Sequence, residues 1–332
     1  YLCTNVEYDY TLDIEHWVKQ FVEYASSRGL IIEHKSARAL LASVASSRLV
    51  IIRSVSVELL PLLQQILFDF VDSKYEPVSF DNVYQYSDLI WTLNEDRYVC
   101  SNLVNSLYRA KALKNHINLC SLENVDFTTF ERKFDKLFAY LSSREDEVKI
   151  NLGQENEVLE FVVPKNMVFI ATADCENYLE TLPKNVAECS LSIELVLRTN
   201  EIFDPEAADN YGYMSCKHLE ELMKYAKEKH YIYEKQWKKF DDVEEQVNEL
   251  SPFSIHNKTV LCLESIAAFI LSCGVEIDEF LDLALASRIV PALKSLKAYE
   301  ATNGDTNLYN IITKLFGEDN VPQTKRTLHK PL

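Results

Sequence analysis

Apolar and polar positions follow one another along the chain in blocks, and the period within each block predicts its secondary structure. Over residues 13–29, apolar side chains recur at helical spacing, with Asp13 in place to cap the start and Gly29 to end the helix. Residues 49–52 form a short, largely β-branched run that indicates a buried strand, and the apolar segment 57–73 has helical length. Strand, turn and helix in this order form the βα unit that opens a parallel sheet.

Strands and helices continue to alternate as far as about residue 198. Further strands are predicted near residues 78–80, 116–122 and 168–173, and further helices near residues 35–46, 100–113 and 126–143. This alternation predicts an α/β fold with a doubly wound parallel sheet.

From about residue 199 the pattern becomes helical. Helical patterns without a convincing strand follow the acidic stretch 201–209, at 216–229, 233–249, 259–272, 276–287 and 306–316. The basic tail 322–332 is expected to be frayed. We therefore divide the chain into an N-terminal helical extension (1–34), an α/β core (35–198) and a helical C-terminal domain (199–332).

Composition narrows the classes of function. Lys and Arg total 34 against 51 Asp and Glu, so the formal charge is −17 and the average surface repels a phosphate backbone. Only six glycines are present, too widely spaced to form a G-x-G-x-x-G or a G-x-x-x-x-G-K-[ST] loop. A glycine-rich phosphate loop is therefore excluded, and nucleic acid binding would require a locally basic surface on this acidic chain.

Cysteine and histidine patterns offer no metal or hydrolase site. The eight cysteines include no C-x-x-C pair, and the seven histidines form neither H-x-x-x-H nor H-E-x-x-H, so we expect no metal and no cofactor. Scattered thiols, with no signal peptide and no run of 18 apolar residues, predict a cytoplasmic protein without a membrane span. The chain does not begin with Met, so we expect a fragment or a processed product.

Two segments resemble a known family. Residues 163–174 (VPKNMVFIATAD) resemble the sensor-1 strand of McrB-type AAA+ NTPases, and residues 283–291 (LALASRIVP) resemble the lid helix of the same family. The resemblance implies an AAA+-like α/β core followed by an all-helical lid, in a family of restriction-system GTPases and ATPases. It also implies that ATP or GTP with Mg²⁺ binds at the loops that follow the core strands.

The residues that would hold the phosphates in such a fold are changed in this chain. In the segment RSVSVELLP, Leu60 stands about where the family's P-loop lysine belongs, and Pro61 where its Mg²⁺-binding hydroxyl belongs. Val55 and Val57 resist the positive φ that a phosphate loop needs, and Glu58 would repel phosphate. The segment therefore lacks the groups of a P-loop.

The family's other catalytic positions are altered as well. Glu123 and Asn124 stand at the end of the Walker-B strand, where Glu123 could still contact a metal but Asn124 is no general base. The sensor-1 residue is Asp174, whose negative charge facing a γ-phosphate would disfavour binding. Cys189 stands near the place of the trans-acting arginine finger and cannot stabilise transition-state charge.

These changes favour a catalytically inactive AAA+-like module that acts as a structural or regulatory subunit. As the resemblance implies, its setting is a restriction or anti-phage assembly, and its partners are proteins, either active AAA+ subunits or a nuclease subunit. Two alternatives stay open: an unrelated α/β domain, and a divergent active NTPase with Glu123 on Mg²⁺ and Arg53 on phosphate. In a purely structural interpretation, Glu123, Asn124 and Asp126 cap the helix that begins near residue 127, and Arg53 is an exposed side chain.

A third alternative is a nucleic-acid-binding module centred on residues 217–240, the one strongly basic region. Lysines alternate there with aromatic residues that can stack on bases, and the candidate patch consists of Lys235, Trp237, Lys238 and Lys239. The same patch would also suit an acidic protein partner. The competing interpretation is a pair of helices whose tyrosines serve packing.

Overall fold

The computed structural model describes most of the chain. The described residues are 7–81, 88, 91–94, 97–128, 141, 147–151, 160–174, 182–200, 211–249, 254–255, 257–295 and 304–328. Predictions for the middle of the helix at 126–143 and for the acidic stretch 201–209 lie outside these residues.

A five-stranded parallel sheet forms the centre of the α/β part. Its strands are β2 (Leu49–Ser54), β3 (Val78–Ser79), β6 (Asn118–Glu123), β9 (Met167–Asp174) and β10 (Leu191–Glu194). Their order across the sheet is β10-β2-β9-β6-β3, and every neighbouring pair is parallel. The strands predicted near 49–52, 78–80, 116–122 and 168–173 are therefore confirmed.

Helices cover both faces of this sheet, which explains why β2 is buried along its whole length. Successive side chains of a strand point to opposite faces. Val50 and Ile52 accordingly belong to one hydrophobic cluster, and Leu49 and Ile51 to the other. The first cluster is completed by α1 (Ile14–Ser27), α2 (His34–Ser46) and α3 (Leu60–Phe70), and the second by α5 (Asn102–Ala112) and α9 (Lys184–Cys189).

The first helix begins and ends where the sequence predicts. The Asp13 carboxylate accepts a hydrogen bond from the His16 N–H at 2.8 Å, which caps α1. Gly29 follows the helix with φ of 87°, a left-handed conformation that glycine adopts without strain.

Three antiparallel strand pairs were not predicted from the sequence. They are β1 (Leu30–Ile32) with β11 (Leu197–Thr199), β4 (Trp91–Asn94) with β5 (Arg97–Cys100), and β7 (Glu147–Asn151) with β8 (Glu160–Pro164). These strands are only three to five residues long, and a local pattern of that length does not distinguish a strand from a loop.

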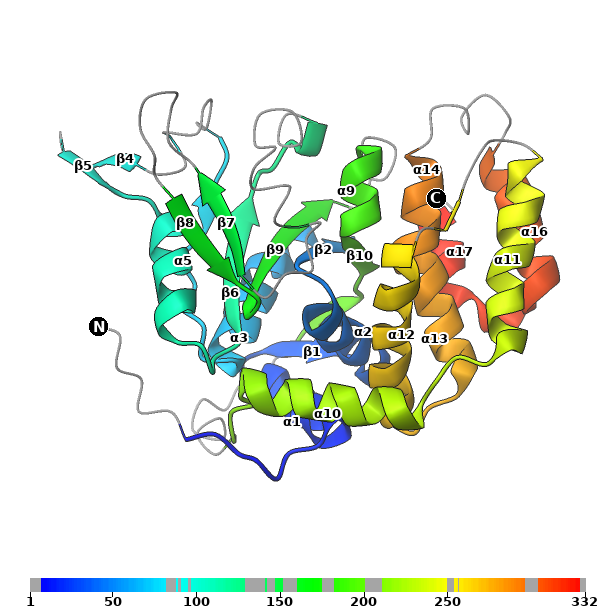
Figure 1. Ribbon diagram of the computed structural model, residues 1–332, viewed down its shortest axis with the longest axis horizontal. Coiled ribbons are helices and arrows are strands. Elements are labelled where there is room, and N and C mark those ends of the chain that lie inside the picture. Colours follow the sequence, from blue (N-terminus) through cyan, green and yellow to red (C-terminus); the bar gives the residue numbers. More distant parts are fainter. Residues whose placement is uncertain are drawn as a thin grey trace.

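The second part of the described chain is helical, as predicted. It contains α10 (Cys216–Lys229), α11 (Glu234–Asn248), α12 (Asn257–Ser272), α13 (Ile277–Ala284), the π-helix η3 (Leu285–Ile289), α14 (Val290–Lys294), α16 (Gly304–Phe316), the 3₁₀ turn η4 (Glu318–Asn320) and α17 (Pro322–Leu328). Figure 1 shows most of these helices beside the sheet, on the side of β10, with α10 crossing below the sheet. Arg288 of η3 joins the two parts, because its Nη1 donates to the carbonyl oxygens of Ala187 and Ser190, just before β10.

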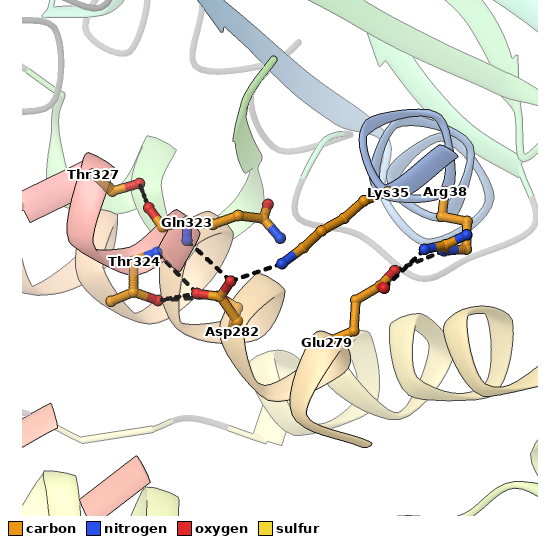
Figure 2. Close-up of polar contacts among 7 residues, drawn as sticks. All are labelled: Lys35, Arg38, Glu279, Asp282, Gln323, Thr324 and Thr327. Carbon is orange, nitrogen blue, oxygen red and sulfur yellow. Dashed lines mark hydrogen bonds and ion pairs between the residues drawn. The ribbon is translucent and has the colours of Figure 1, made fainter. Parts of the chain in front are cut away.

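The prediction of a frayed tail at 322–332 is wrong for residues 322–328. These residues form α17, which Asp282 of α13 holds in place (Figure 2). The Asp282 side chain is fully buried and accepts hydrogen bonds from the backbone N–H groups of Gln323 and Thr324, and from the Thr324 hydroxyl. A basic, polar segment gives no local sign of a buried partner forty residues away.

Two ion pairs connect α2 with α13 beside this contact. Lys35 Nζ lies 3.2 Å from Asp282 Oδ2, and Arg38 donates from Nε and Nη2 to the two oxygens of Glu279 at 2.6 and 2.8 Å (Figure 2). The bidentate geometry fixes the orientation of both side chains. The helical part is therefore attached to the α/β part through charged side chains as well as through the apolar core.

Among the described residues, no helix combines the length and the apolar character that crossing a bilayer requires.

Candidate functional site

The strand order places the candidate site at the carboxyl edge of the parallel sheet. The chain leaves β2 toward β3 on one side of the sheet, and leaves β9 toward β10 on the other. In open α/β sheets, ligands bind outside the carboxyl ends of the two strands where the direction of the connections reverses. Asp174 and Glu123 are the last residues of β9 and β6, and Arg53 is the last but one of β2, so the fold brings these three predicted positions to one edge.

Arg53 is buried, so the interpretation of an exposed arginine is wrong. Only 2% of the residue is exposed, because β2 continues through Ser54 instead of ending at residue 52. Arg53 Nε donates to Ser192 Oγ at 3.0 Å, and Nη1 lies 3.5 Å from Glu194 Oε2. Both partners lie on one face of β10, since strand residues two apart share a face. The guanidinium is therefore directed along the sheet edge.

The segment after β2 does not have the form of a phosphate loop. Its first turn is a 3₁₀ helix, η1 (Val57–Leu59), and the Ser56 N–H is already bonded to Ser54 Oγ at 3.1 Å. Leu60, at the position of the expected lysine, is buried in the hydrophobic core, and Pro61 follows in the first turn of α3. An aliphatic side chain in the core supplies no positive charge at this edge.

Glu123 takes part in a hydrogen-bonded network at the end of β6. The Tyr75 hydroxyl donates to Glu123 Oε1 at 2.9 Å and lies 3.3 Å from Gln64 Oε1, while Gln64 Nε2 donates to Ser121 Oγ. Burial, together with the hydrogen bond and the charge of Glu123, raises the pKa of Tyr75 to about 12. Tyr75 therefore stays protonated near neutral pH and remains a donor to the carboxylate.

The two residues that follow β6 have separate structural roles. Asn124 is exposed, adopts a left-handed φ of 56°, and donates from Nδ2 to Asp81 Oδ2 at 2.9 Å. Asp126 Oδ1 accepts from the Thr128 N–H at 3.0 Å, at the start of the helix at 127. The capping interpretation is confirmed for Asp126. Glu123 and Asn124 make other contacts.

Asp174 and Cys189 lie at opposite edges of the sheet. Asp174 pairs in register with Ser54 at the carboxyl ends of β9 and β2. Cys189 ends α9, just before β10, and Ser47 Oγ, which precedes β2, lies 3.5 Å from its carbonyl oxygen. Cys189 is therefore at the amino edge, away from Arg53 and Glu123.

The carboxyl edge does not fit a magnesium nucleotide well. No group of three or more His, Cys, Asp or Glu side chains able to hold a metal occurs in the described part of the chain. Arg53 has the charge that phosphate requires, but Ser192 and Glu194 contact its guanidinium. Glu123 has the charge that Mg²⁺ requires, but the Tyr75 hydroxyl donates to its carboxylate. Sequence reasoning missed these three partners, although the alternation of Ser192 and Glu194 along β10 is a signal that would have found two of them.

The basic segment 217–240 forms α10, the start of α11 and the turn between them. Trp237 is half-buried against the core, and Lys239 Nζ lies 5.1 Å from the centroid of the Phe316 ring. Lys235 and Lys238 are exposed. The structure thus separates the candidate patch into two packing residues, Trp237 and Lys239, and two solvent-facing lysines.

Three tyrosines, one in the last part of α10 and two in the turn, are exposed, so the prediction that they serve packing is wrong for them. Tyr225, Tyr231 and Tyr233 are 55%, 58% and 58% exposed. Lys229 Nζ lies 4.4 Å from the Tyr225 ring centroid, and the rings of Tyr231 and Tyr233 lie 4.7 Å apart. We call Tyr225, Tyr231 and Tyr233 with Lys229 the tyrosine turn.

Comparison with known proteins gives a relationship of fold. No protein-family model matches the chain, and no curated protein matches it. Among solved structures, the chain is similar to a crystal structure described as that of a "putative ATPase" from Cytophaga hutchinsonii, with a TM-score of 0.53. The two chains are 13% identical, and the match covers 91% of this chain and 94% of the other. The predicted fold class, an α/β core with a parallel sheet followed by helices, is confirmed.

Proposed function

We propose that the chain is a catalytically inactive AAA+-like module that acts as a structural or regulatory subunit. The observation that carries this proposal is the carboxyl edge of β2, where Arg53 is enclosed by Ser192 and Glu194, and Leu60 is buried in place of a lysine. Phosphate binding at such an edge needs backbone N–H groups and an ammonium directed to the ligand. The fold is retained without these groups.

The partners we propose are proteins, namely active AAA+ subunits or a nuclease subunit of a restriction or anti-phage assembly. This part of the proposal rests on the likeness of residues 163–174 and 283–291 to McrB-type NTPases. It is supported by where these segments lie: the first contributes the central strand β9, and the second spans the end of α13, η3 and the start of α14 beside β10.

Steady-state turnover of ATP and GTP by the purified chain tests the proposal. We expect no turnover above that of Glu123→Ala and Arg53→Ala variants purified in the same way. Phosphate release that is equal in all three proteins is a contaminant. Release that occurs in the natural chain and is lost in Glu123→Ala contradicts the proposal and favours the divergent NTPase.

A second candidate function is binding of single-stranded nucleic acid at the tyrosine turn. Exposed aromatic rings among cations provide the stacking and charge that such binding uses, and three tyrosines more than half exposed within nine residues favour it here. Lys224, Lys227, Lys235 and Lys238 surround the turn in sequence and are exposed. A chain with a net charge of −17 needs a locally basic surface to bind nucleic acid, and these lysines provide one.

Fluorescence anisotropy with a labelled oligothymidylate tests this second candidate. The expected result is a salt-dependent affinity that falls about tenfold in a Tyr231→Ala/Tyr233→Ala variant, since stacking contributes roughly 1–3 kcal/mol per base. Neutralising Lys235, Lys238 and Lys239 should lower the slope of affinity against salt. Tyr10→Ala/Tyr108→Ala is the matched control, because these tyrosines are 60% and 59% exposed elsewhere. An equal loss in the control contradicts the assignment.

A further inference from the structure

A cavity of about 400 Å³ lies at the amino edge of the sheet, on the opposite side from the candidate nucleotide edge. Its walls come from the end of α2, one face of α10, Ser265 of α12, and the residues that precede β6 and begin β9. The volume is within the range of roughly 300–1,000 Å³ that small-molecule sites occupy. The cavity is therefore large enough for an organic ligand.

The floor of this cavity is apolar. Five buried or nearly buried side chains from four separate segments form it: Val44, Ile117, Val168, Leu219 and Met223. Water at such a floor has few hydrogen-bonding partners, so an apolar group that displaces it gains hydrophobic free energy. The floor favours a ligand with an apolar body.

The rim of the cavity is cationic. Lys165, Lys224 and Lys227 line it together with one carboxylate, that of Glu220. Glu220 Oε2 lies 3.1 Å from Lys165 Nζ, so the carboxylate is engaged across the rim. Lys224 and Lys227 are exposed, and neither makes an ion pair with another described residue. They lie three residues apart on α10, on neighbouring positions of one helix face.

A second cavity, of about 660 Å³, adjoins the first and shares several of its lining residues, including Lys227 and Lys165. It adds the arginines Arg48 and Arg288 and the carboxylate of Glu188. Positive charge thus gathers around both cavities in a chain of formal charge −17. The positive charges of this rim would attract the anionic end of a ligand.

We propose that the cavity between α2, α10 and α12 binds a small amphipathic anion, with its apolar body on the floor and its carboxylate, sulfonate or phosphate between Lys224 and Lys227. The juxtaposition of an apolar floor with two cations that make no ion pair with another described residue defines this class of ligand. The site uses no residue of the nucleotide edge, so it is independent of whether the chain hydrolyses nucleotide.

The test is a titration of the full chain with 1-anilinonaphthalene-8-sulfonate, an amphipathic anion whose fluorescence rises on transfer to an apolar site, followed by displacement with decanoate. We expect saturable binding of one probe per chain and displacement by decanoate, but not by the same concentration of inorganic phosphate. A Lys224→Ala/Lys227→Ala variant should bind the probe about tenfold more weakly, because charge-assisted contacts contribute roughly 1.5–3 kcal/mol.

The matched control is Lys111→Ala/Lys217→Ala, which removes the same charge at two exposed positions outside the cavity. It should leave the dissociation constant within about twofold, whereas Ala45→Leu, which adds volume at the wall, should weaken binding with all charges kept. Circular dichroism confirms that each variant is folded. Equal affinity in the two lysine variants, or displacement by phosphate as efficient as by decanoate, overturns the proposal.

Discussion

Arg53 and Glu194 pair in register near the carboxyl ends of the neighbouring parallel strands β2 and β10, with Nη1 and Oε2 3.5 Å apart. The arginine is 2% exposed and the glutamate side chain 14%. A guanidinium removed from water in this way requires a nearby carboxylate, because desolvation of an isolated charge is costly. We infer that Arg53 stabilises the fold near the end of β2, at an edge where an NTPase would use a cation to bind phosphate.

Single substitutions of this pair should destabilise the protein. We expect Arg53→Ala and Glu194→Ala each to lower the free energy of unfolding by about 2–4 kcal/mol, since each leaves one buried charge without its partner. The double variant should cost less than the sum of the two, with a coupling of roughly 1–3 kcal/mol. Urea denaturation of the four proteins measures this cycle. Additive losses would mean that the two side chains do not act on each other.

Asp282 should determine whether α17 is ordered. Its carboxylate accepts from the N–H groups of Gln323 and Thr324 at 3.0 and 2.9 Å, and also contacts Lys35 Nζ. Asp282→Ala leaves these donors unsatisfied, and we expect a loss of about 3 kcal/mol in the free energy of unfolding. Hydrogen exchange of residues 322–328 should become fast in this variant.

The control for this prediction is Glu279→Gln, which weakens the neighbouring ion pair with Arg38 and leaves α17 untouched. Exchange at 322–328 should then match the natural chain. Slow exchange of this segment in Asp282→Ala would show that apolar packing alone holds α17.

Tyr75 should make stability depend on pH in the alkaline range. Its pKa is raised from 10.0 to about 12 in the folded chain, so the folded state holds the proton more tightly than the unfolded state. The associated stability is fully present below pH 10 and is lost as the pH rises from 10 to 12. Urea midpoints at pH 9, 10 and 11 should therefore fall more steeply in the natural chain than in Tyr75→Phe. Parallel curves would contradict the Tyr75–Glu123 contact.

Local patterns were sufficient to predict the longer elements and the layer architecture. The run at 49–52 and the helical period of 13–29 are strong because burial on both faces, or on one helix face, dictates residue type at every position. The helices α10 and α11 were likewise predicted almost residue for residue. The local pattern of apolar and polar residues is enough to predict these elements.

What could not be predicted depends on contacts between distant segments. Arg53 resembles a loop residue in sequence, and only the pairing of β2 with β10 places Ser192 and Glu194 beside it. The helix α17 depends on Asp282, which is far away in sequence and accepts hydrogen bonds from the backbone N–H groups at its start. The lysines of α10 were predicted as part of a single basic segment, yet helix geometry divides them between a cavity rim and the tyrosine turn.

A titration of the purified chain with fluorescent ATP and GTP analogues, with and without Mg²⁺, tests directly whether the carboxyl edge of the sheet binds nucleotide. We expect no saturable binding up to millimolar nucleotide, because the edge of β2 presents neither a phosphate loop nor a lysine. Arg53→Ala and Glu123→Ala should leave this result unchanged. Tight, Mg²⁺-dependent binding that either substitution abolishes would overturn the proposal of an inactive module and establish the chain as a divergent nucleotide-binding protein.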